Sequence, residues 1–316
     1  GGLGQRRMNK QSASDPARAG LAFGLLAYGL WGVLPIYFKQ LGGVSPVDIV
    51  AHRVVWSLLF LGILLAATGG WSQVRTGVRD RRTLVLLLTT SVLIAVNWLL
   101  YVYAVTSGHI LAGSLGYYLN PLMNIVLGRF ILKEKLTGMQ WTAVAIAAAG
   151  VSVLAAGAGT TLWISLTLCF SFATYGLLRK IAAVDALAGL SVETAILIPV
   201  ALAWLALGLG AGRPVLGSTS EETWLLVLAG VVSTTPLLLF TAAARRLRYS
   251  TLGMLQFVAP TLQFLLAVAL YGEAFTRAHA IAFGAIWAAL LLYTTSLVRD
   301  LRAQRAAATS PELSEP

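Results

Sequence analysis

The most constraining feature of this chain is the number of long apolar stretches. Ten of them, each about 20 residues long, fill nearly all of the sequence between residues 20 and 298. A helix of about 20 residues spans roughly the 30 Å hydrocarbon thickness of a bilayer. The sequence therefore predicts an all-α membrane protein with ten transmembrane helices, at about residues 20–38, 48–68, 84–105, 110–128, 138–156, 161–178, 188–208, 223–244, 250–271 and 278–297.

Charge is scarce and unevenly placed. Only 11% of residues are charged, against about a quarter in soluble domains, so most of the folded surface is expected to face lipid. If the spans alternate, 19 of the 23 Lys and Arg residues fall on one side, whereas Lys39, Arg213 and Arg277 fall on the other and Arg53 lies within a span. Positive charge marks the cytoplasmic side, which predicts that both termini are cytoplasmic. The net charge of +11 therefore does not indicate a nucleic-acid partner.

The two ends of the sequence are polar. Residues 1–19 are expected to be a disordered cytoplasmic arm and residues 299–316 a cytoplasmic tail, loose from residue 303 onward. The first apolar stretch is too long for a cleaved signal peptide and lacks a convincing cleavage site. With Cys169 as the only cysteine, no internal disulfide can form, and this thiol is expected to be buried mid-span.

The sequence contains an internal repeat, with residues 20–157 resembling residues 160–298. Each repeat holds five predicted spans, and because five is odd, the second copy is expected to insert upside down. Inverted repeats are typical of secondary transporters, although channels and membrane enzymes can also carry repeats. Four pairs share an offset of 139 residues, which makes chance similarity improbable: Pro121 and Pro260, Asn124 and Gln263, Glu134 and Glu273, Thr137 and Thr276.

Three ionisable residues lie inside predicted spans, where they usually face a cavity or a partner. Glu193 can serve as a proton-coupling carboxylate or as a structural hydrogen-bond acceptor. Arg53 can attract an anionic group of a substrate or snorkel toward the headgroups, and His52 beside it is more often a packing residue. Arg53 and Glu193 lie near opposite surfaces, roughly 15 Å apart along the membrane normal, so a direct ion pair is not expected.

Uncharged polar side chains gather on repeat-related spans. Asn120 and Asn124 share one helix face, as do Gln256 and Gln263. Amides and phenols suit a site for a polar or amphipathic organic molecule, whereas the alternative role is interhelical hydrogen bonding. The predicted substrate-binding residues are Trp31, Asn97, Tyr101, Tyr117, Asn120, Asn124, Tyr175, Gln256 and Gln263, and the predicted coupling or gating residues are Glu193, Arg53 and His52.

Motifs of enzymes and metal sites are missing from the sequence. It contains no H-E-x-x-H pair, no P-loop and no G-x-S-x-G elbow. The histidines, His52, His109 and His279, do not have a metal-ligand spacing. We therefore expect no catalytic residues, no metal and no cofactor, and any active transport has to draw on an ion gradient.

Several runs resemble the RarD group of the EamA branch of the drug/metabolite transporter superfamily. These runs, within about residues 20–297, are His52 to Ser57, Asn97-Trp98, Ser114 to Leu122, Phe170 to Ala173, Tyr175 to Leu177, Glu193-Thr194, Pro236 to Ala244, Arg248, Ser250 to Gly253 and Tyr271 to Glu273. The resemblance implies two EamA repeats of five helices in a bacterial cell inner membrane, and export or exchange of small organic solutes. In the first repeat the Gly-Glu signature reads Lys133-Glu134, with Lys in place of Gly, which weakens arguments from that loop.

These observations predict a secondary active transporter of small organic metabolites or drugs that works by alternating access. Its partners are a small-molecule substrate, the lipid bilayer and, if Glu193 couples, protons. A non-transporting membrane sensor or scaffold that binds a ligand in the same cavity is the alternative, and a membrane enzyme is a weaker one. The sequence leaves the substrate, the direction of transport and the choice between monomer and homodimer open.

Overall fold

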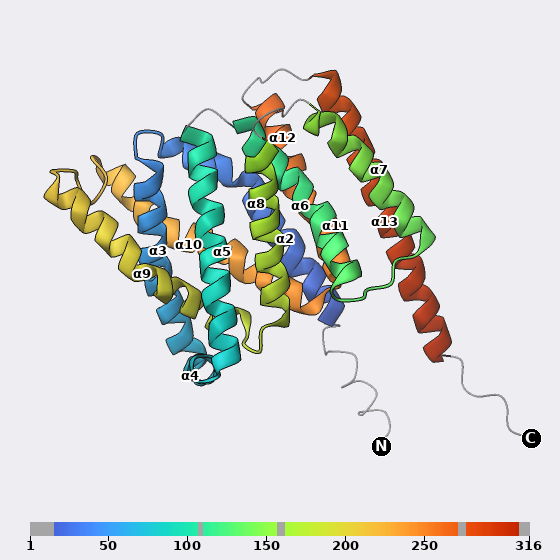
Figure 1. Ribbon diagram of the computed structural model, residues 1–316, viewed down its shortest axis with the longest axis horizontal. Helices are drawn as coiled ribbons and strands as arrows, with labels where there is room; N and C mark the ends of the chain where they lie inside the picture. The colour runs from blue at the N-terminus through green and yellow to red at the C-terminus, as the bar shows by residue number, and fades with distance from the viewer. Residues whose placement is uncertain (1–15, 107–109, 157–161, 271–275, 310–316) are drawn as a thin grey trace, which may run out of the picture.

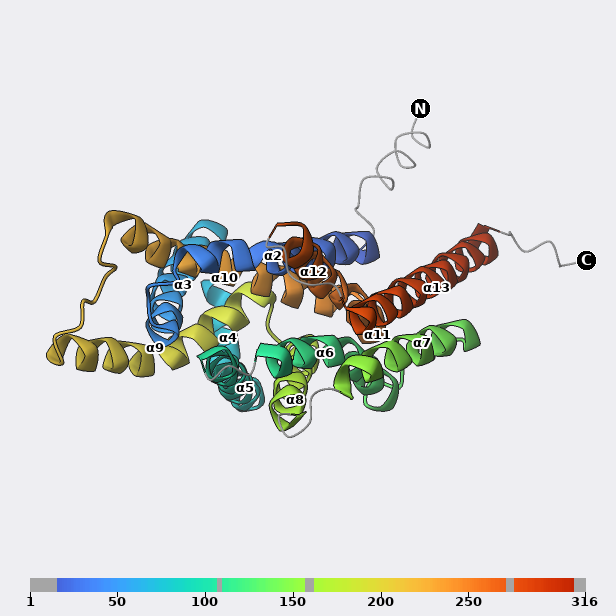
Figure 2. The ribbon, with the colours of Figure 1, turned by 90° about the horizontal axis from the view of Figure 1, so that it is seen from above.

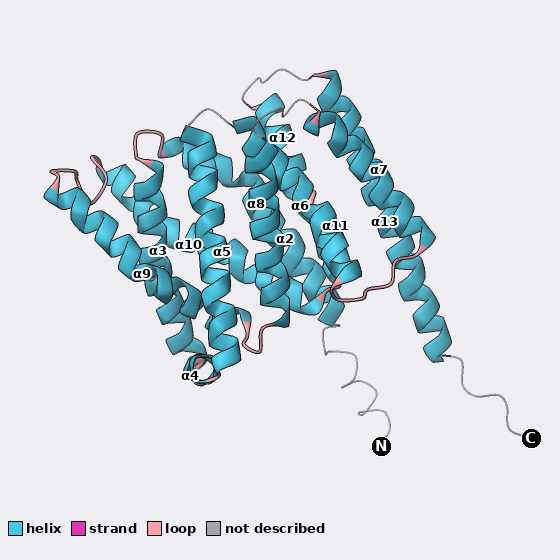
Figure 3. Ribbon diagram, in the orientation of Figure 1, coloured by secondary structure: helices cyan, strands magenta, loops and turns pink. Residues whose placement is uncertain are grey.

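The computed structural model describes residues 16–106, 110–156, 162–270 and 276–309, and within these ranges the chain is helical and contains no strand. The helices are α2 (Pro16–Gln40), α3 (Pro46–Thr68), α4 (Trp71–Arg79), α5 (Arg81–Thr106), α6 (Ile110–Phe130), α7 (Gly138–Ala155), α8 (Leu162–Ile181), α9 (Ala186–Gly210), α10 (Ser220–Arg246), α11 (Tyr249–Gln256), α12 (Val258–Ala269) and α13 (Arg277–Thr309). Most connections between them are short (Figure 3).

Eight of these helices are long and apolar enough to cross a membrane, which establishes a multi-pass membrane protein: α2, α3, α5, α7, α8, α9, α10 and α13. The remaining two predicted spans fall on α6 and on the consecutive helices α11 and α12. Pro260 explains why the ninth predicted span is divided. It lacks a backbone N–H, and its ring would crowd the carbonyl of Gln256, so the chain breaks between α11 and α12 at Phe257. The count of ten spans stays a prediction.

Local sequence signals set several helix ends. Thr137 begins α7 with a capping box, in which its hydroxyl accepts from the backbone N–H of Gln140 and the Gln140 amide accepts in return. Asp185 caps α9. Asp80 accepts hydrogen bonds from the hydroxyl and backbone N–H of Thr83 at the start of α5, and these bonds lower the pKa of the Asp80 carboxyl.

The helices pack in pairs that join the two predicted repeats. α3 packs on α9, α6 on α11 and α7 on α13, each pair combining equivalent spans of the two repeats. Further contacts also come in matched form: α10 packs on α2 and α3, as α5 packs on α8 and α9 (Figures 1 and 2). The core between α2, α8 and α10 is aromatic, with Tyr28, Phe172, Tyr175 and Phe240 in contact.

The described ends of the chain lie on the same side of the bundle. In Figure 1 the start of α2 and the end of α13 are at the lower edge, together with α4 and the connections from α6 to α7, from α8 to α9 and from α10 to α11. These are the segments that carry most of the Lys and Arg residues. The alternation of the predicted spans therefore agrees with the arrangement of the helices.

Three features at this basic side differ from the sequence-based expectation. α4 is a short helix in a predicted loop, and it combines the exposed Trp71 and Val78 with Arg75 and Arg79, a composition typical of a helix lying at a membrane surface. α13 continues through Thr309 into the predicted tail. Arg179 follows the predicted span 161–178 and was therefore expected in a cytoplasmic loop, but it is fully buried within the last turn of α8. The predicted arm before residue 16, like Tyr271 to Glu273, lies outside the described residues.

Candidate functional site

A cavity of about 380 Å³ lies between α3 and α5 of the first predicted repeat and α9 and α10 of the second. Most of its wall is aliphatic or aromatic, including Val50, Ile94, Leu197 and Trp204. Its charged lining residues are Arg53 and Glu193, and Ser57, Thr194 and Thr234 add hydroxyl groups. A volume of this size is near the lower end of the ~300–1,000 Å³ range of small-molecule sites.

Arg53 lies on α3 and is buried, with 8% of its surface exposed. Its guanidinium carbon is 3.5 Å from the ring centroid of Trp98 on α5, a cation–π contact. None of the ion pairs among the described residues includes Arg53. The expectation that Arg53 and Glu193 do not pair directly therefore agrees with the structure, although both line one cavity.

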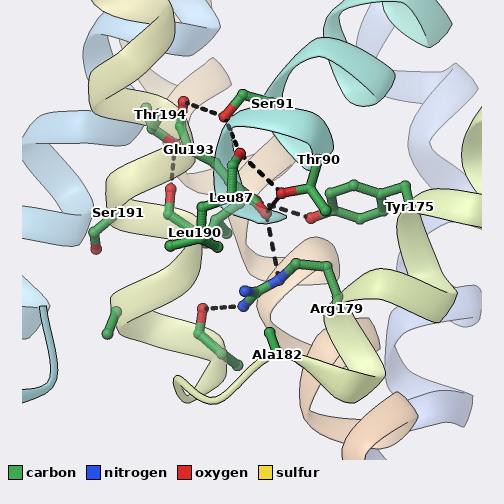
Figure 4. Close-up of polar contacts among 12 residues, drawn as sticks. Leu87, Thr90, Ser91, Tyr175, Arg179, Ala182, Leu190, Ser191, Glu193 and Thr194 are labelled. Atoms are coloured by element: carbon green, nitrogen blue, oxygen red, sulfur yellow. Dashed lines mark hydrogen bonds and ion pairs between the residues drawn. The ribbon is translucent and has the colours of Figure 1, made fainter. Parts of the chain in front are cut away.

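Glu193 is held by a polar network that joins α5, α8 and α9 (Figure 4). Its side chain is 1% exposed and accepts hydrogen bonds from the Thr90 hydroxyl at 2.5 Å and the Tyr175 hydroxyl at 3.2 Å. The Arg179 Nε atom lies 3.5 Å from the same carboxylate. Glu193 therefore has the fixed partners of a structural acceptor and, at the same time, faces the cavity.

Arg179 is a partner of Glu193 in the candidate site that the sequence did not reveal. Its Nη2 atom donates to the backbone carbonyls of Asp185 and Ala186, which turn the chain from α8 into α9. Gly189 makes room for the guanidinium, because a Cβ atom at this position would clash with it. The only available signal was the i,i+4 spacing from Tyr175, since a partner on another helix leaves no trace in a single sequence.

A second polar cluster ties α3 to α9 and to the connection after it. Asp48 forms an ion pair with Arg213 at 3.0 Å and accepts a hydrogen bond from Trp204 at 2.8 Å. One turn along α3, the His52 Nε2 atom lies 2.6 Å from the Val215 carbonyl oxygen, and Trp56 donates to His52 Nδ1. Because Nδ1 accepts, Nε2 carries the proton and donates to Val215, so His52 has the contacts of a packing residue.

The predicted amide residues lie at helix contacts outside the lining of this cavity. Asn97 on α5 donates to the Leu168 carbonyl and to Ser171, both at 3.0 Å. Gln263 on α12 donates to the backbone carbonyl of Trp31 at 3.0 Å. These bonds are the interhelical contacts that the alternative role predicted.

The other three predicted amides are Asn120, Asn124 and Gln256. Asn124 donates to Gln256 at 2.7 Å, which joins α6 to α11. Among the described residues, both amide atoms of the fully buried Asn120 lack a hydrogen-bond partner. The role of the amides in binding a substrate therefore stays a prediction.

The predicted aromatic site residues form two groups. Tyr101 and Tyr117 contact each other, with ring centroids 5.7 Å apart, and Tyr101 also contacts Trp98 at the cavity wall. Trp31 packs against Phe172 and Phe240 in the aromatic core, next to Tyr175. Tyr175 reaches the cavity region through its bond to Glu193.

Cys169 is buried, as expected. In the described part of the chain, no group of three His, Cys, Asp or Glu residues is arranged to hold a metal ion.

The apolar spans and the cavity between the two halves define a multi-pass membrane protein with a small-molecule-sized interior site. Residues 18–156 match the EamA-like transporter family. An "Uncharacterized transporter" of Vibrio cholerae is 44% identical over 92% of this chain and 97% of its own length. "Protein RarD" of Escherichia coli K12 is 43% identical over 90% of this chain and 97% of its own.

The chain belongs to the RarD group of the EamA-like transporter family. A solved crystal structure also has this fold, with a TM-score of 0.69 over 88% of this chain and 98% of the other. Its sequence identity of 21% means that the similarity concerns the fold alone.

Proposed function

We propose that the protein is a secondary active transporter that moves small organic metabolites or drugs across the bacterial inner membrane by alternating access. The observation that carries this proposal is the cavity lined by α3, α5, α9 and α10, which joins the two predicted repeats. Substrate sites of transporters with inverted repeats lie at the repeat interface, where each half contributes to the wall. The matched packing of the two halves supports ten spans in two inverted repeats.

We further propose that both termini are cytoplasmic and that transport is coupled to protons. The basic segments at one edge of the bundle support this orientation. Glu193 is the coupling carboxylate, because it is buried, lines the cavity and has both a positive partner and hydroxyl partners. Protonation removes its charge, which weakens its hold on Arg179 and gives the helices α5, α8 and α9 a second set of contacts.

Proteoliposomes loaded with a pH-sensitive dye test this function. When a pooled small-molecule extract of cells is added outside, the wild-type protein is expected to accumulate solutes, identified by mass spectrometry, and to change the internal pH. Glu193→Gln, purified as a monodisperse protein, should lose the pH change. Glu221→Gln replaces an exposed carboxylate at the start of α10 and should behave like the wild type.

The outcomes test the coupling role of Glu193 and the transport activity separately. Proton movement that persists in Glu193→Gln rules out the coupling role. The wild-type protein could instead bind solutes in an amount proportional to the protein present, with no sustained accumulation inside the liposomes. In that case the alternative of a non-transporting sensor or scaffold is correct.

A further inference from the structure

The cavity contains one positive charge that the described residues leave uncompensated. Glu193 is balanced by Arg179, at 3.5 Å, and Asp48 at the start of α3 is balanced by Arg213, at 3.0 Å. Arg53 lines the cavity, is 8% exposed, and is in none of these pairs. A charged side chain inside the membrane usually pairs with an opposite charge or faces a polar cavity, so this guanidinium is the group with most to gain from a ligand.

The contact between Arg53 and Trp98 leaves the N–H groups of the guanidinium free to bind a ligand. The guanidinium carbon of Arg53 lies 3.5 Å from the centroid of the Trp98 ring. Among the described residues, Arg53 donates no hydrogen bond and forms no ion pair, so its N–H groups are available to a ligand. An oriented fork of this kind binds a carboxylate through two parallel hydrogen bonds.

The rest of the cavity favours an organic ligand with an apolar body. The cavity wall is largely aliphatic, for example at Val50, Ile94 and Leu197. Ser57 and Thr234 add hydroxyl groups to it. Thr234 donates to Ser57 at 2.5 Å and Ser57 donates to the backbone carbonyl of Gly230 at 3.2 Å, so both hydroxyls are already engaged as donors. A fully polar ligand would lose its hydration without replacement along this wall.

We propose that this cavity binds a small organic monoanion, with its carboxylate held by Arg53 and its apolar body packed against α3, α5 and α9. The inference rests on the proposed function, because it names the class of substrate. It leaves the role of Glu193 in coupling unchanged. A free metabolite and an anionic lipid headgroup share the anionic chemistry; we assign the site to the free carboxylate.

Equilibrium binding to the full-length protein in phosphatidylcholine nanodiscs tests this assignment without requiring transport. The probes are three matched pairs, indole-3-acetate with indole-3-acetamide, phenylacetate with phenylacetamide, and benzoate with benzamide. In each pair the shape is nearly constant, and a neutral amide replaces the negatively charged carboxylate. For at least one pair, the acid is expected to bind the wild-type protein roughly tenfold or more tightly than the amide.

Variants assign the charge preference to Arg53. Arg53→Gln should abolish the preference for the acid, whereas Arg53→Lys, which keeps the charge without the fork, should retain part of it. Arg277→Gln removes an exposed arginine at the start of α13 and should bind the acid as the wild type does. The measurement on the wild-type protein stands even if an Arg53 variant fails to fold.

Several results would overturn the proposal: no binding of any acid, equal binding of acid and amide, or equal losses in the Arg53 and Arg277 variants. Suppression of acid binding by phosphatidylglycerol in the nanodiscs would instead identify a lipid site and would also overturn it. If acids bind through Arg53 but proteoliposomes show no sustained uptake, the transporter proposal fails while the anion site stands. If uptake occurs without acid preference, only the anion site fails.

Discussion

At the scale of single residues, the site depends on how buried charges are balanced. Arg179 and Glu193 are 0% and 1% exposed, and they lie on different helices. Removing both charges from water is costly, and their attraction repays this cost only when geometry and further hydrogen bonds are favourable. Thr90, Tyr175 and two backbone carbonyls supply those bonds here. The pair is therefore more sensitive to the loss of one partner than to the loss of both.

Arg179→Gln is expected to lower the free energy of unfolding by on the order of 3 kcal/mol, because it leaves the Glu193 carboxylate buried without a counter-charge. The double variant Arg179→Gln with Glu193→Gln should recover part of this loss, since neither charge then remains. Thermal denaturation midpoints of the detergent-solubilised proteins measure both effects. A double variant that is less stable than Arg179→Gln alone would contradict this account.

At the scale of secondary-structure elements, the connection from α6 to α7 holds the start of α11. Glu134 accepts hydrogen bonds from the backbone N–H groups of Tyr249, at 2.6 Å, and of Ser250, at 3.0 Å. It thereby caps a helix whose own N-cap residue, Arg248, makes no side-chain cap. Lys133 has a φ of 55°, in the left-handed region, which explains why the related signature has Gly at this position.

Lys133→Gly is therefore expected to stabilise the protein by up to about 1 kcal/mol, because glycine adopts a positive φ without the steric penalty of a side chain. The midpoint of thermal denaturation in detergent should rise. Lys135→Gly, two residues further along the same connection, is the matched control, because a residue with negative φ gains nothing from glycine. An equal or larger gain in the control would refute the conformational explanation.

At the scale of the whole molecule, the cavity is bounded by two polar clusters on opposite portions of α9. Asp48, Arg213 and Trp204 connect the start of α3 to the end of α9. Glu193 and Arg179 lie near the start of α9, toward the basic side of the bundle. Alternating access requires that the contacts at the two ends break in turn, so Asp48 is expected to close the external end.

Asp48→Ala should open that end. In a Cys169→Ala background, Ala201→Cys lines the cavity at a position that is 6% exposed. Its labelling by a membrane-impermeant maleimide, added outside sealed right-side-out vesicles, is expected to become several-fold faster when Asp48 is replaced. Leu216→Cys, at an exposed position after α9, serves as the control and should label at one rate in both backgrounds. No change at Ala201→Cys would show that Asp48 does not restrict entry.

Two of the residues singled out in the sequence belong to types that are rare in their surroundings. Arg53 and Glu193 are ionisable groups within apolar spans, and both line the cavity. The amides were grouped by spacing along single helices, but Asn97 and Gln263 face partners on other helices. The burial of Arg179 was not predicted because this residue is next to Lys180 at the end of a span, where a positive charge ordinarily faces the cytoplasm.

The sequence by itself predicted the eight helices that are long and apolar enough to cross a membrane, because spanning depends on length and apolar composition, which are local properties of a segment. It also determined the family, through runs of residues such as His52 to Ser57. Only the tertiary structure decided which polar groups meet. Apolar residues surround most spans on all sides, so the sequence pattern does not fix the rotation of a helix about its axis. That rotation pairs Glu193 with Arg179 and leaves Arg53 on Trp98 without an acidic partner among the described residues.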